Sequence, residues 1–460
     1  MKILAVDFGS TYTKLTAIDA TNAVILGTAS AFTTIDTDII HGFRVALRHL
    51  EQQIGVFAYN RLLCCSSAGG GLKMVALGLV PELTAKAARL AASSAGAKVV
   101  KTYAFEISDV EQDEIHRIDP DIVLLCGGTD GGNKEVIVAN AHRLCEIDRN
   151  FTVIVAGNKS ASHQIKTIFE AKGKDYMIIG NVMPTFNTLD IEPARKSIRE
   201  VFIEKIIDAK GLSGIQAMAS SDVIPTPLAV MAGCELLSKG TSKTPGIGDF
   251  MAIDLGGATT DIYSMSDGKP TLSNVIVKGL PEPFSKRTVE GDLGMRYSLH
   301  SLLEATNMEA IASELQMQPN DIIVWAEKCI AHPDTLAGCR EEQCMDEAFA
   351  RSAVEIAVER HCGHLESAYT PLGEVFSLTG KDLSNLAYII GIGGTIINSD
   401  HPPAILKGAL YNSQKPQILK PRQPEFLLDR KYIFASMGLL SSIDPELALY
   451  FMKKEIVKSE

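Results

Sequence analysis

The sequence predicts an α/β fold in which helices cover parallel sheets, and three observations support this. The 460 residues include 37 glycines and only 6% aromatic residues, so Ala, Val, Ile and Leu supply most of the 46% hydrophobic content. Such a composition is typical of strands that are buried on both faces. From about residue 98, strand-like and helix-like segments alternate regularly, and several apolar runs end in glycine-rich loops.

The first hundred residues read mainly as strands, at 2–7, 14–19, 24–33 and 61–66. A helix is expected from a cap at 36–38 to about residue 53, where Gly55 stops it. We interpret Ala68–Gly71 as a structural turn.

The region 98–190 predicts crossover units on a parallel sheet. Strands are expected at 99–105, 121–126, 151–156 and 175–179, and helices at 110–116, 134–145 and 160–171. The loop 126–135 follows a strand and opens a helix, a position where parallel sheets bind ligands. A structural turn and a second ligand or partner site both remain open for this loop.

The second half of the chain mixes strands with longer helical stretches. Helices are expected at 192–210 and from Pro225 to about 238, and strands at 249–254, 261–265 and 387–390. Residues 292–365 read as mostly helical and 401–428 as loop-like. A strand at 432–435 and a helix to about 454 complete the prediction.

One internal repeat organises these elements. Residues 3–14 and 251–261 each contain a buried strand, then Asp-x-Gly-[Ser/Gly], then hydroxyl residues and a second strand. The glycines permit a tight turn that comes close to a ligand, and amides in such a turn bind phosphate oxygens. Asp7 and Asp254, at the strand ends, are suitable for Mg²⁺, which favours carboxylate and water ligands.

A third glycine loop, Gly391–Thr395, ends a later strand. Three such loops favour a two-lobed protein with a nucleotide between its lobes, although each is also compatible with an ordinary tight turn.

The order of the three loops resembles that of the actin, Hsp70 and sugar-kinase superfamily of ATPases. That resemblance implies two ribonuclease H-like lobes, with Asp7 and Asp254 organising Mg²⁺ and the attacking water. It implies that the first two loops wrap the phosphates of ATP and that the third lies against the adenosine. The implied nucleotide-binding residues are Gly9, Ser10, Thr11, Thr13, Lys14, Gly256, Gly257, Ala258, Thr259, Thr260, Gly391, Gly393, Gly394 and Thr395.

Four segments extend the resemblance over nearly the whole chain: Asp7–Lys14, Ser67–Glu82, Gly127–Glu135 and Lys278–Arg296. They are similar to the accessory protein family of adenosylcobalamin-dependent glutamate (methylaspartate) mutase, called GlmL or MutL. The resemblance implies a cytoplasmic, chaperone-like reactivating factor, a slow ATPase that uses ATP and Mg²⁺. Its implied partners are the mutase subunits, and a homodimer is left open.

The resulting domain plan has five parts. Residues 1–97 begin the first ATPase lobe, and 98–190 form an α/β insertion or elaboration, or supply late strands of that lobe. Residues 191–248 form connecting helices and a loop. Residues 249–435 form the second lobe, which includes a helical subdomain at 292–365, and residues 436–460 form a C-terminal helix.

Charged residues cluster at 278–296. Glu290 and Asp292 are candidates for a general base, and three cations are candidates for phosphate contacts: Lys286, Arg287 and Arg296. A solvated loop with surface ion pairs is the simpler alternative. Lys14 is interpreted either as a phosphate ligand or as a charge at the rim of the site.

Composition excludes several classes of function. A net charge of −11 disfavours nucleic acid as a partner. No run of 18 apolar residues predicts a membrane span. Nine cysteines in 460 residues fit a reducing cytoplasm rather than a disulfide framework. The Cys and His residues at 339–364 lack the convergent spacing of a zinc site.

Three functions therefore compete. The preferred one is an ATP-driven accessory protein whose lobe movement changes its affinity for a mutase. The alternatives are a small-molecule kinase on the same fold and a scaffold that does not hydrolyse ATP.

Overall fold

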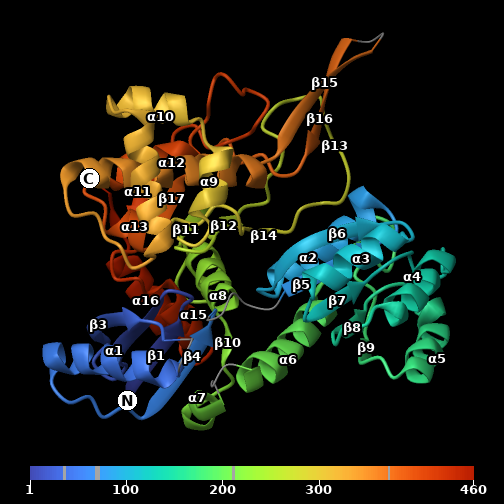
Figure 1. Ribbon diagram of the computed structural model, residues 1–460, viewed down its shortest axis with the longest axis horizontal. Helices are drawn as coiled ribbons and strands as arrows, with labels where there is room; N and C mark the ends of the chain where they lie inside the picture. The colour runs from blue at the N-terminus through green and yellow to red at the C-terminus, as the bar shows by residue number, and fades with distance from the viewer. Residues whose placement is uncertain (35–37, 68–72, 210–212, 371–372, 460) are drawn as a thin grey trace. The chain divides into compact units, whose positions relative to one another are not determined.

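The computed structural model describes residues 1–34, 38–67, 73–209, 213–370 and 373–459 (Figure 1). The predicted turn Ala68–Gly71 lies outside them. The chain forms two compact units. The first comprises Met1–Thr21, Ala29–Ala229 and Gly279–Pro281, and the second comprises Asn22–Thr28, Val230–Lys278 and Glu282–Glu460.

The first sheet has the strand order β10-β4-β1-β2-β3. Its strands are β1 (Lys2–Phe8), β2 (Tyr12–Asp19), β3 (Val24–Phe32), β4 (Arg61–Ser66) and β10 (Ile224–Pro225). β1 is antiparallel to β2 and parallel to β4, and β4 is parallel to β10. Helix α1 (Ile39–Ile54) buries Phe43, Ala46 and Leu50 in the core. Asp38 caps α1 and Gly55 ends it at φ 79°, as predicted.

A five-stranded parallel sheet lies in the segment between β4 and β10, with the order β6-β5-β7-β8-β9. Its strands are β5 (Lys73–Gly78), β6 (Lys98–Ala104), β7 (Ile122–Leu125), β8 (Thr152–Val155) and β9 (Tyr176–Ile178). The alternation of helices and strands predicted for 98–190 is confirmed. The sheet also takes in β5, which precedes residue 98.

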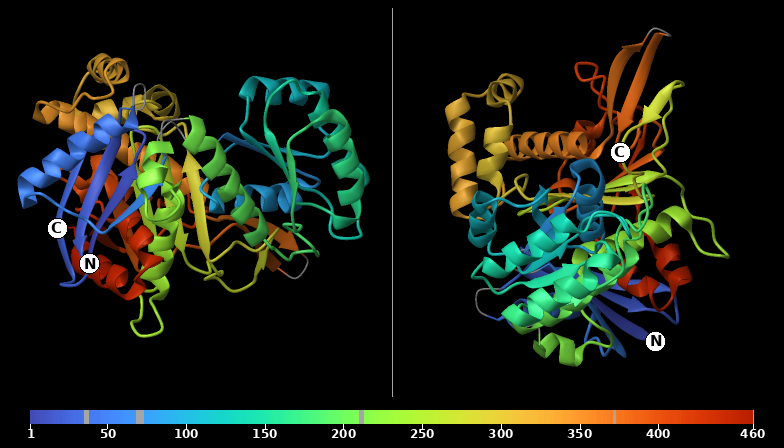
Figure 2. Two further views of the ribbon diagram at one scale, coloured as in Figure 1. Left: turned by 90° about the horizontal axis from the view of Figure 1, so that it is seen from below. Right: turned by 90° about the vertical axis from the view of Figure 1, so that its right-hand side faces the viewer.

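Helices cover both faces of this parallel sheet (Figure 2). Side chains such as Met74 and Leu124 share a core with α2 (Lys86–Ser94) and α6 (Glu192–Ala209). Their neighbours Val75 and Leu125 face the other way, toward α3 (Asp109–Ile118), α4 (Glu135–Glu146) and α5 (Ser162–Lys172). This alternation places two separate hydrophobic layers on the two faces. Short helical turns at Pro81–Ala85 (η1) and Lys159–Ala161 (η2) precede α2 and α5, and α7 (Ser213–Met218) follows α6.

The second unit contains a sheet with the order β14-β12-β11-β17-β18-β19. Its strands are β11 (Phe250–Leu255), β12 (Thr260–Met265), β14 (Ser285–Glu290), β17 (Tyr388–Ile392), β18 (Glu425–Leu428) and β19 (Val457–Lys458). β11 pairs antiparallel with β12, and β12 with β14, whereas β17 and β18 run parallel to β11. Without β19, this repeats the arrangement of the first sheet: the first strand pairs antiparallel with the next strand on one side and parallel with a later strand on the other. The prediction of two ribonuclease H-like lobes is confirmed in this respect.

Helices form the rest of the second unit. α9 (Leu299–Ala305), α10 (Met308–Leu315), α11 (Pro319–Ala331) and α12 (Arg340–His361) confirm the helical region predicted within 292–365. The others are α8 (Thr226–Lys239), which begins in the first unit, α13 (Gly394–Ile397), α14 (Pro402–Leu406), η3 (Lys407–Ala409), α15 (Phe434–Ser441) and α16 (Pro445–Glu455). A hairpin of β15 (His364–Thr370) and β16 (Gly373–Thr379) extends with β13 (Val275–Val277) away from these helices (Figure 1).

Two predictions about the C-terminal region are wrong. The residues of the strand expected at 432–435 form the turn before α15 and the first two residues of that helix, and the loop-like stretch 401–428 contains α14 and the parallel strand β18. Apolar runs of four residues do not distinguish a strand from the first turn of a buried helix, because both are apolar on every side.

Candidate functional site

The hairpin between β1 and β2 forms the Asp7 loop, residues 7–14. Asp7 pairs with Lys14 across the ladder, and the Gly9 amide donates to the Tyr12 carbonyl at 3.1 Å. A Cβ at Gly9 would lie 2.6 Å from that carbonyl oxygen, so the turn requires glycine.

Asp7 is buried, with 3% of its surface exposed, and several groups surround its carboxylate. Thr226 Oγ1 donates to Oδ1 at 2.5 Å, and Lys14 Nζ lies 3.7 Å from Oδ2. The Cys65 thiol lies 3.5 Å from Oδ1. Burial and then the Asp7 charge raise the pKa of Cys65 well above its ordinary value, so the thiol keeps its proton and donates. A buried anion is thus compensated by a hydroxyl, a thiol and an ammonium.

The other residues of the Asp7 loop differ in accessibility. Ser10 Oγ donates to the Ser67 carbonyl at 3.0 Å, and Ser10 and Thr11 are partly exposed. Thr13 is fully buried, and its hydroxyl bonds Thr33 Oγ1 at 3.1 Å. Thr13 therefore stabilises the inside of the hairpin rather than its exposed turn.

The Asp254 loop, residues 254–261, repeats this geometry in the second unit. Asp254 pairs with Asp261 across β11 and β12, and the Gly256 amide donates to the Thr259 carbonyl at 2.9 Å. The Asp-x-Gly turn is thus closed by the same amide-to-carbonyl bond in both loops. Thr260 is buried and donates to the Leu293 carbonyl.

The backbone of the Asp254 loop has a defined orientation. The carbonyls of Gly256 and Gly257 accept bonds of 2.8–3.1 Å from the amides of residues 295–297, and Ser298 Oγ donates to the Ala258 carbonyl. In a trans peptide the following N–H points opposite to the carbonyl. The amides of residues 257–259 therefore point away from 295–298, as a set of donors suited to an anion.

Asp254 is partly exposed at the end of β11, and Tyr432 Oη donates to its Oδ1 at 3.1 Å. Tyr432 has a left-handed backbone, with φ 55°. The buried carboxylate of Asp429 holds the following turn by accepting the amides of Ile433 and Phe434 at 3.0 and 2.9 Å. A rare backbone conformation thus aims a tyrosine hydroxyl at this aspartate.

The Gly391 loop, residues 391–395, adjoins the Asp254 loop within the second unit. β17 runs parallel to β11 with Ile392 opposite Asp254. Gly393 has φ 92°, and a Cβ there would lie 2.3 Å from the Leu255 carbonyl oxygen. Gly394 and Thr395 then begin α13, where Gly394 is exposed. The structure therefore brings together two of the three predicted loops inside one unit.

Glu290 ends β14 opposite Thr260. Arg360 Nη1 lies 2.7 Å from Glu290 Oε2 and 2.9 Å from both oxygens of Asp292. Burial raises the pKa of Glu290, while Arg360 opposes the shift. Glu290 thus lies beside the Asp254 loop as a carboxylate engaged by an arginine.

The three cations proposed for phosphate contacts are engaged inside the second unit. Arg287 forms a buried ion pair with Asp261 at 2.6 Å, and Arg296 pairs with Asp346 at 2.9 Å. Lys286 Nζ donates to the His361 carbonyl at 2.9 Å. These contacts support the structure of β12, β14 and α12 rather than an exposed phosphate site.

The loop at 127–132 is fixed by asparagine side chains. Asn158 accepts from the Gly131 amide at 3.0 Å and donates to the carbonyls of Gly132 and Asn133. Asn181 donates to the Gly128 carbonyl and to Asp130 Oδ1. These bonds favour the interpretation as a structural turn.

Mg²⁺ with a phosphate ligand fits the residues present at the two aspartate loops. Mg²⁺ commonly takes one or two carboxylates and keeps several waters. Asp7 and Asp254 offer carboxylates at strand ends, and the Asp254 loop offers aligned amides. Among the described residues, no group of three or more His, Cys, Asp or Glu side chains is arranged to hold a metal alone.

The chain matches a known protein family over nearly its whole length. The family described as MutL protein matches residues 3–456 of this chain. The chain belongs to the MutL family. It is 46% identical over 457 residues to Protein MutL of Clostridium tetanomorphum, and the alignment covers 99% of each chain. The family predicted from the sequence is therefore confirmed.

Solved structures resemble this MutL-family chain only distantly. A glycerol dehydratase reactivase is 9% identical with a TM-score of 0.36, over 96% of this chain and 99% of that one. A ligand-bound xylulose kinase from Lactobacillus acidophilus is 10% identical with a TM-score of 0.35, over 100% of this chain and 93% of that one. Among the described residues, no helix is both long and apolar enough to cross a membrane.

Sequence reasoning missed three residues that this MutL-family protein places at its aspartates: Cys65, Thr226 and Tyr432. Cys65 lies on β4, the strand that pairs in parallel with β1. The apolar run at 61–66 predicts that strand, so the sequence held a signal for this residue. Thr226 and Tyr432 are 219 and 178 positions from their partners, and no local pattern reports such contacts.

Proposed function

We propose that this MutL-family chain is an ATP-binding accessory protein that reactivates or assists an adenosylcobalamin-dependent glutamate (methylaspartate) mutase. ATP and Mg²⁺ bind through the Asp7 and Asp254 loops, with the Gly391 loop beside the adenosine. The chain acts as a slow ATPase whose nucleotide state moves its lobes and changes its affinity for the mutase subunits.

One observation carries this proposal. The same Asp-x-Gly turn, closed by the same amide-to-carbonyl bond, ends the first strand of two sheets with the same order of their first five strands. A structural turn alone gives no reason for an acidic residue at the same position in both copies. Phosphate and Mg²⁺ provide that reason, because one needs donors and the other needs carboxylates.

Each residue of the site has its own role in the proposed reaction. The amides of residues 257–259 orient the terminal phosphate, and Mg²⁺ supplies charge neutralisation when bound. Asp254, which is partly exposed, orients the attacking water. Asp7 holds its position through Thr226 and Lys14. Glu290 is the candidate general base, and its ion pair with Arg360 favours the charged form of its carboxylate.

The test is ATP turnover by the purified chain with Mg²⁺, with and without purified mutase. Asp254→Asn should abolish turnover, while Asp267→Asn, an exposed aspartate of the same unit, should leave it unchanged. Slow turnover that changes with the mutase supports the proposal. Fast turnover only with a metabolite indicates a kinase, and no nucleotide binding at millimolar concentration indicates a scaffold; either result overturns it.

A second measurement tests reactivation. Mutase that carries damaged cofactor should recover activity with this protein, ATP and fresh adenosylcobalamin. Recovery without ATP, or none with it, would contradict the ATP-driven role.

A further inference from the structure

We infer that Thr33 is a positioning residue of the Asp7 loop, which turns amides of that loop toward the phosphates of ATP. Thr33 directly follows β3, outside the loop, and only 2% of its surface is exposed. The inference rests on the proposed function for the identity of the ligand, because it concerns the same nucleotide site.

Thr33 holds two carbonyl groups of the Asp7 loop at once. Its amide donates to the Thr11 carbonyl at 2.8 Å, and its hydroxyl donates to the Gly9 carbonyl at 2.9 Å. In a trans peptide the N–H of the next residue points opposite to the carbonyl. The amides of Ser10 and Tyr12 therefore point away from Thr33.

The direction of the Thr33 hydroxyl is fixed by its neighbours. A hydroxyl has one proton, and the Gly9 carbonyl can only accept, so Thr33 donates to Gly9. Thr33 Oγ1 then accepts from Thr13 Oγ1, which lies 3.1 Å away, and both threonines are buried. This chain of bonds holds the Gly9–Ser10 peptide in one orientation.

The amides of the turn face outward while its carbonyls are bonded. The Phe8 carbonyl accepts the Ser67 amide at 2.9 Å. Among the described residues, neither the Ser10 amide nor the Thr11 amide donates to a protein acceptor, and both residues are partly exposed. Amides at an exposed turn, with the carbonyls held behind them, are suited to an anion.

The Asp254 loop has the same arrangement with different donors. There the amides of residues 295–297 hold the Gly256 and Gly257 carbonyls, and Ser298 Oγ holds the Ala258 carbonyl. In both loops a segment from outside thus bonds the carbonyls of the turn. In the Asp7 loop Thr33 supplies two of these bonds, so a single substitution tests the arrangement.

The test compares a non-hydrolysable ATP analogue with Mg²⁺ and adenosine, which lacks the phosphates. The dissociation constant of each ligand is measured by titration of the full chain. Thr33→Val keeps the shape of the side chain but removes the hydroxyl that holds the Gly9 carbonyl. The dissociation constant of the analogue should rise about three- to tenfold, the range of one neutral hydrogen bond, while that of adenosine stays within about twofold.

Two further variants make the result specific to the hydroxyl. Thr33→Ser keeps the hydroxyl and should bind the analogue within about twofold of the wild type. Thr33→Ala removes the hydroxyl with a smaller side chain and should weaken binding as the valine variant does. It supplies a second measurement if Thr33→Val folds poorly, and the melting temperature of each variant reports its folding.

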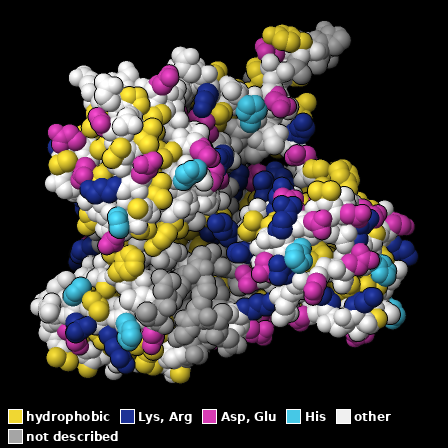
Figure 3. All heavy atoms as spheres, viewed as in Figure 1, with side chains coloured by type: hydrophobic (Ala, Val, Ile, Leu, Met, Phe, Trp, Pro, Cys, Tyr) yellow, Lys and Arg dark blue, Asp and Glu magenta, His cyan; other side chains and the backbone are white. Residues whose placement is uncertain are grey.

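Charged groups on the surface require a separate control. Lysine and arginine side chains are scattered over the visible face of the molecule (Figure 3), and such cations attract any polyanion. The titrations therefore use about 0.15 M salt, which screens exposed charges beyond roughly 8 Å. Binding of the analogue under these conditions reports a defined site.

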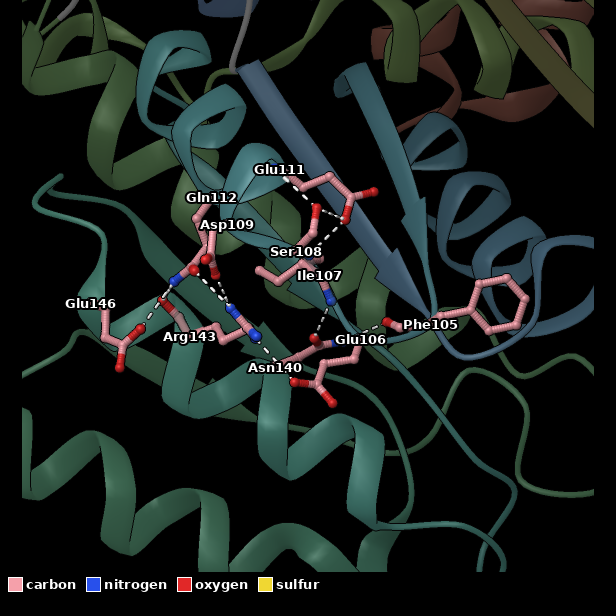
Figure 4. Close-up of polar contacts among 10 residues, drawn as sticks. All are labelled: Phe105, Glu106, Ile107, Ser108, Asp109, Glu111, Gln112, Asn140, Arg143 and Glu146. Atoms are coloured by element: carbon pink, nitrogen blue, oxygen red, sulfur yellow. Dashed lines mark hydrogen bonds and ion pairs between the residues drawn. The ribbon is translucent and has the colours of Figure 1, made fainter.

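Ser108→Ala provides the matched control variant. Ser108 lies in the same unit as Thr33, and its hydroxyl also bonds the backbone: it accepts the Glu111 amide at 3.4 Å and donates to Glu111 Oε2 at 2.9 Å (Figure 4). These contacts form the cap of α3 rather than part of the Asp7 loop. Ser108→Ala should lower stability, as the loss of a cap does, yet bind the analogue within about twofold of the wild type.

The outcomes separate the two proposals. If the wild-type chain does not bind the analogue at millimolar concentration, the proposed function is wrong and the role of Thr33 falls with it. If it binds and Thr33→Val binds equally well, only the role of Thr33 is overturned. An equal loss of affinity for the analogue and for adenosine also overturns it, because the effect would then not depend on the phosphates. A loss as large in Ser108→Ala does the same.

Discussion

Thr226 Oγ1 donates a hydrogen bond of 2.5 Å to Oδ1 of Asp7, across 219 positions of sequence. Thr226 is the first residue of α8, directly after β10, and β10 is separated from β1 only by β4. The position of the Asp7 carboxylate therefore depends on a residue near the middle of the chain.

Replacing Thr226 tests this dependence. Thr226→Val keeps the shape but removes the donor, so it should destabilise the protein by about 1.5–3 kcal/mol, as expected for a bond to a charged group. ATP turnover should fall as well. Thr226→Ser keeps a hydroxyl at this position and should retain most of the stability and most of the ATP turnover. Chemical denaturation and turnover assays measure the two effects; equal behaviour of the Val and Ser variants would contradict the role.

Tyr432 should tune the use of Mg²⁺ at Asp254. Tyr432→Phe removes the hydroxyl that lies 3.1 Å from Asp254 Oδ1, so the Mg²⁺ concentration for half-maximal turnover should rise about tenfold. Tyr411→Phe is the control, because the Tyr411 ring packs on Arg422, away from this contact. A Mg²⁺ dependence unchanged in Tyr432→Phe would show that the hydroxyl does not position the carboxylate.

The glycines at 393 and 394 should differ in their tolerance of a methyl group. Gly393→Ala places a Cβ 2.3 Å from the Leu255 carbonyl oxygen at φ 92°, and should destabilise the protein by roughly 2 kcal/mol or more. At Gly394 the nearest atom to a new Cβ is 3.8 Å away, so alanine should be nearly neutral for stability. Melting temperatures of the two variants provide the comparison.

Lys381 should make stability depend on pH. It is fully buried, its Nζ donates to the Phe284 carbonyl at 2.6 Å, and burial, followed by the charge of Lys286, lowers its pKa to about 7. The unfolded chain therefore binds more protons between pH 7 and about 10.4, the ordinary lysine pKa, so stability rises with pH in that window.

Lys381→Met removes this titration. The melting temperature of the wild type, relative to that of Lys381→Met, should rise by at least about 2 °C from pH 7 to pH 9.5. The comparison within one pH cancels titrations that the two proteins share. A constant difference between them would show that Lys381 is not held neutral.

Local patterns predicted the elements that form by local rules. Asp38 and Gly55 delimit α1, and the repeated Asp-x-Gly signature placed both aspartate loops on the correct hairpins. The family resemblance depends on these motifs. They also predict the strand ends that carry the candidate site.

Other elements depend on partners that are distant in sequence. The sequence at β14, which follows Pro281 and Pro283, favours a charged loop, yet the strand forms because β12 offers an edge for pairing. β15 and β16 lack an alternating apolar pattern and pair mainly with each other. Arg287 is a sequence candidate for a phosphate contact, but it pairs with Asp261, two positions along β12 from the residue opposite it in the β12–β14 ladder, and no sequence spacing reveals that register.

The segment that forms the parallel sheet β6-β5-β7-β8-β9 leaves the first sheet after β4 and returns to it at β10. Cys65 lies just before the departure and Thr226 just after the return, and both touch the Asp7 carboxylate. Both chain connections of the parallel sheet therefore end at neighbours of one carboxylate, so a displacement of that sheet would reach Asp7 through two covalent connections.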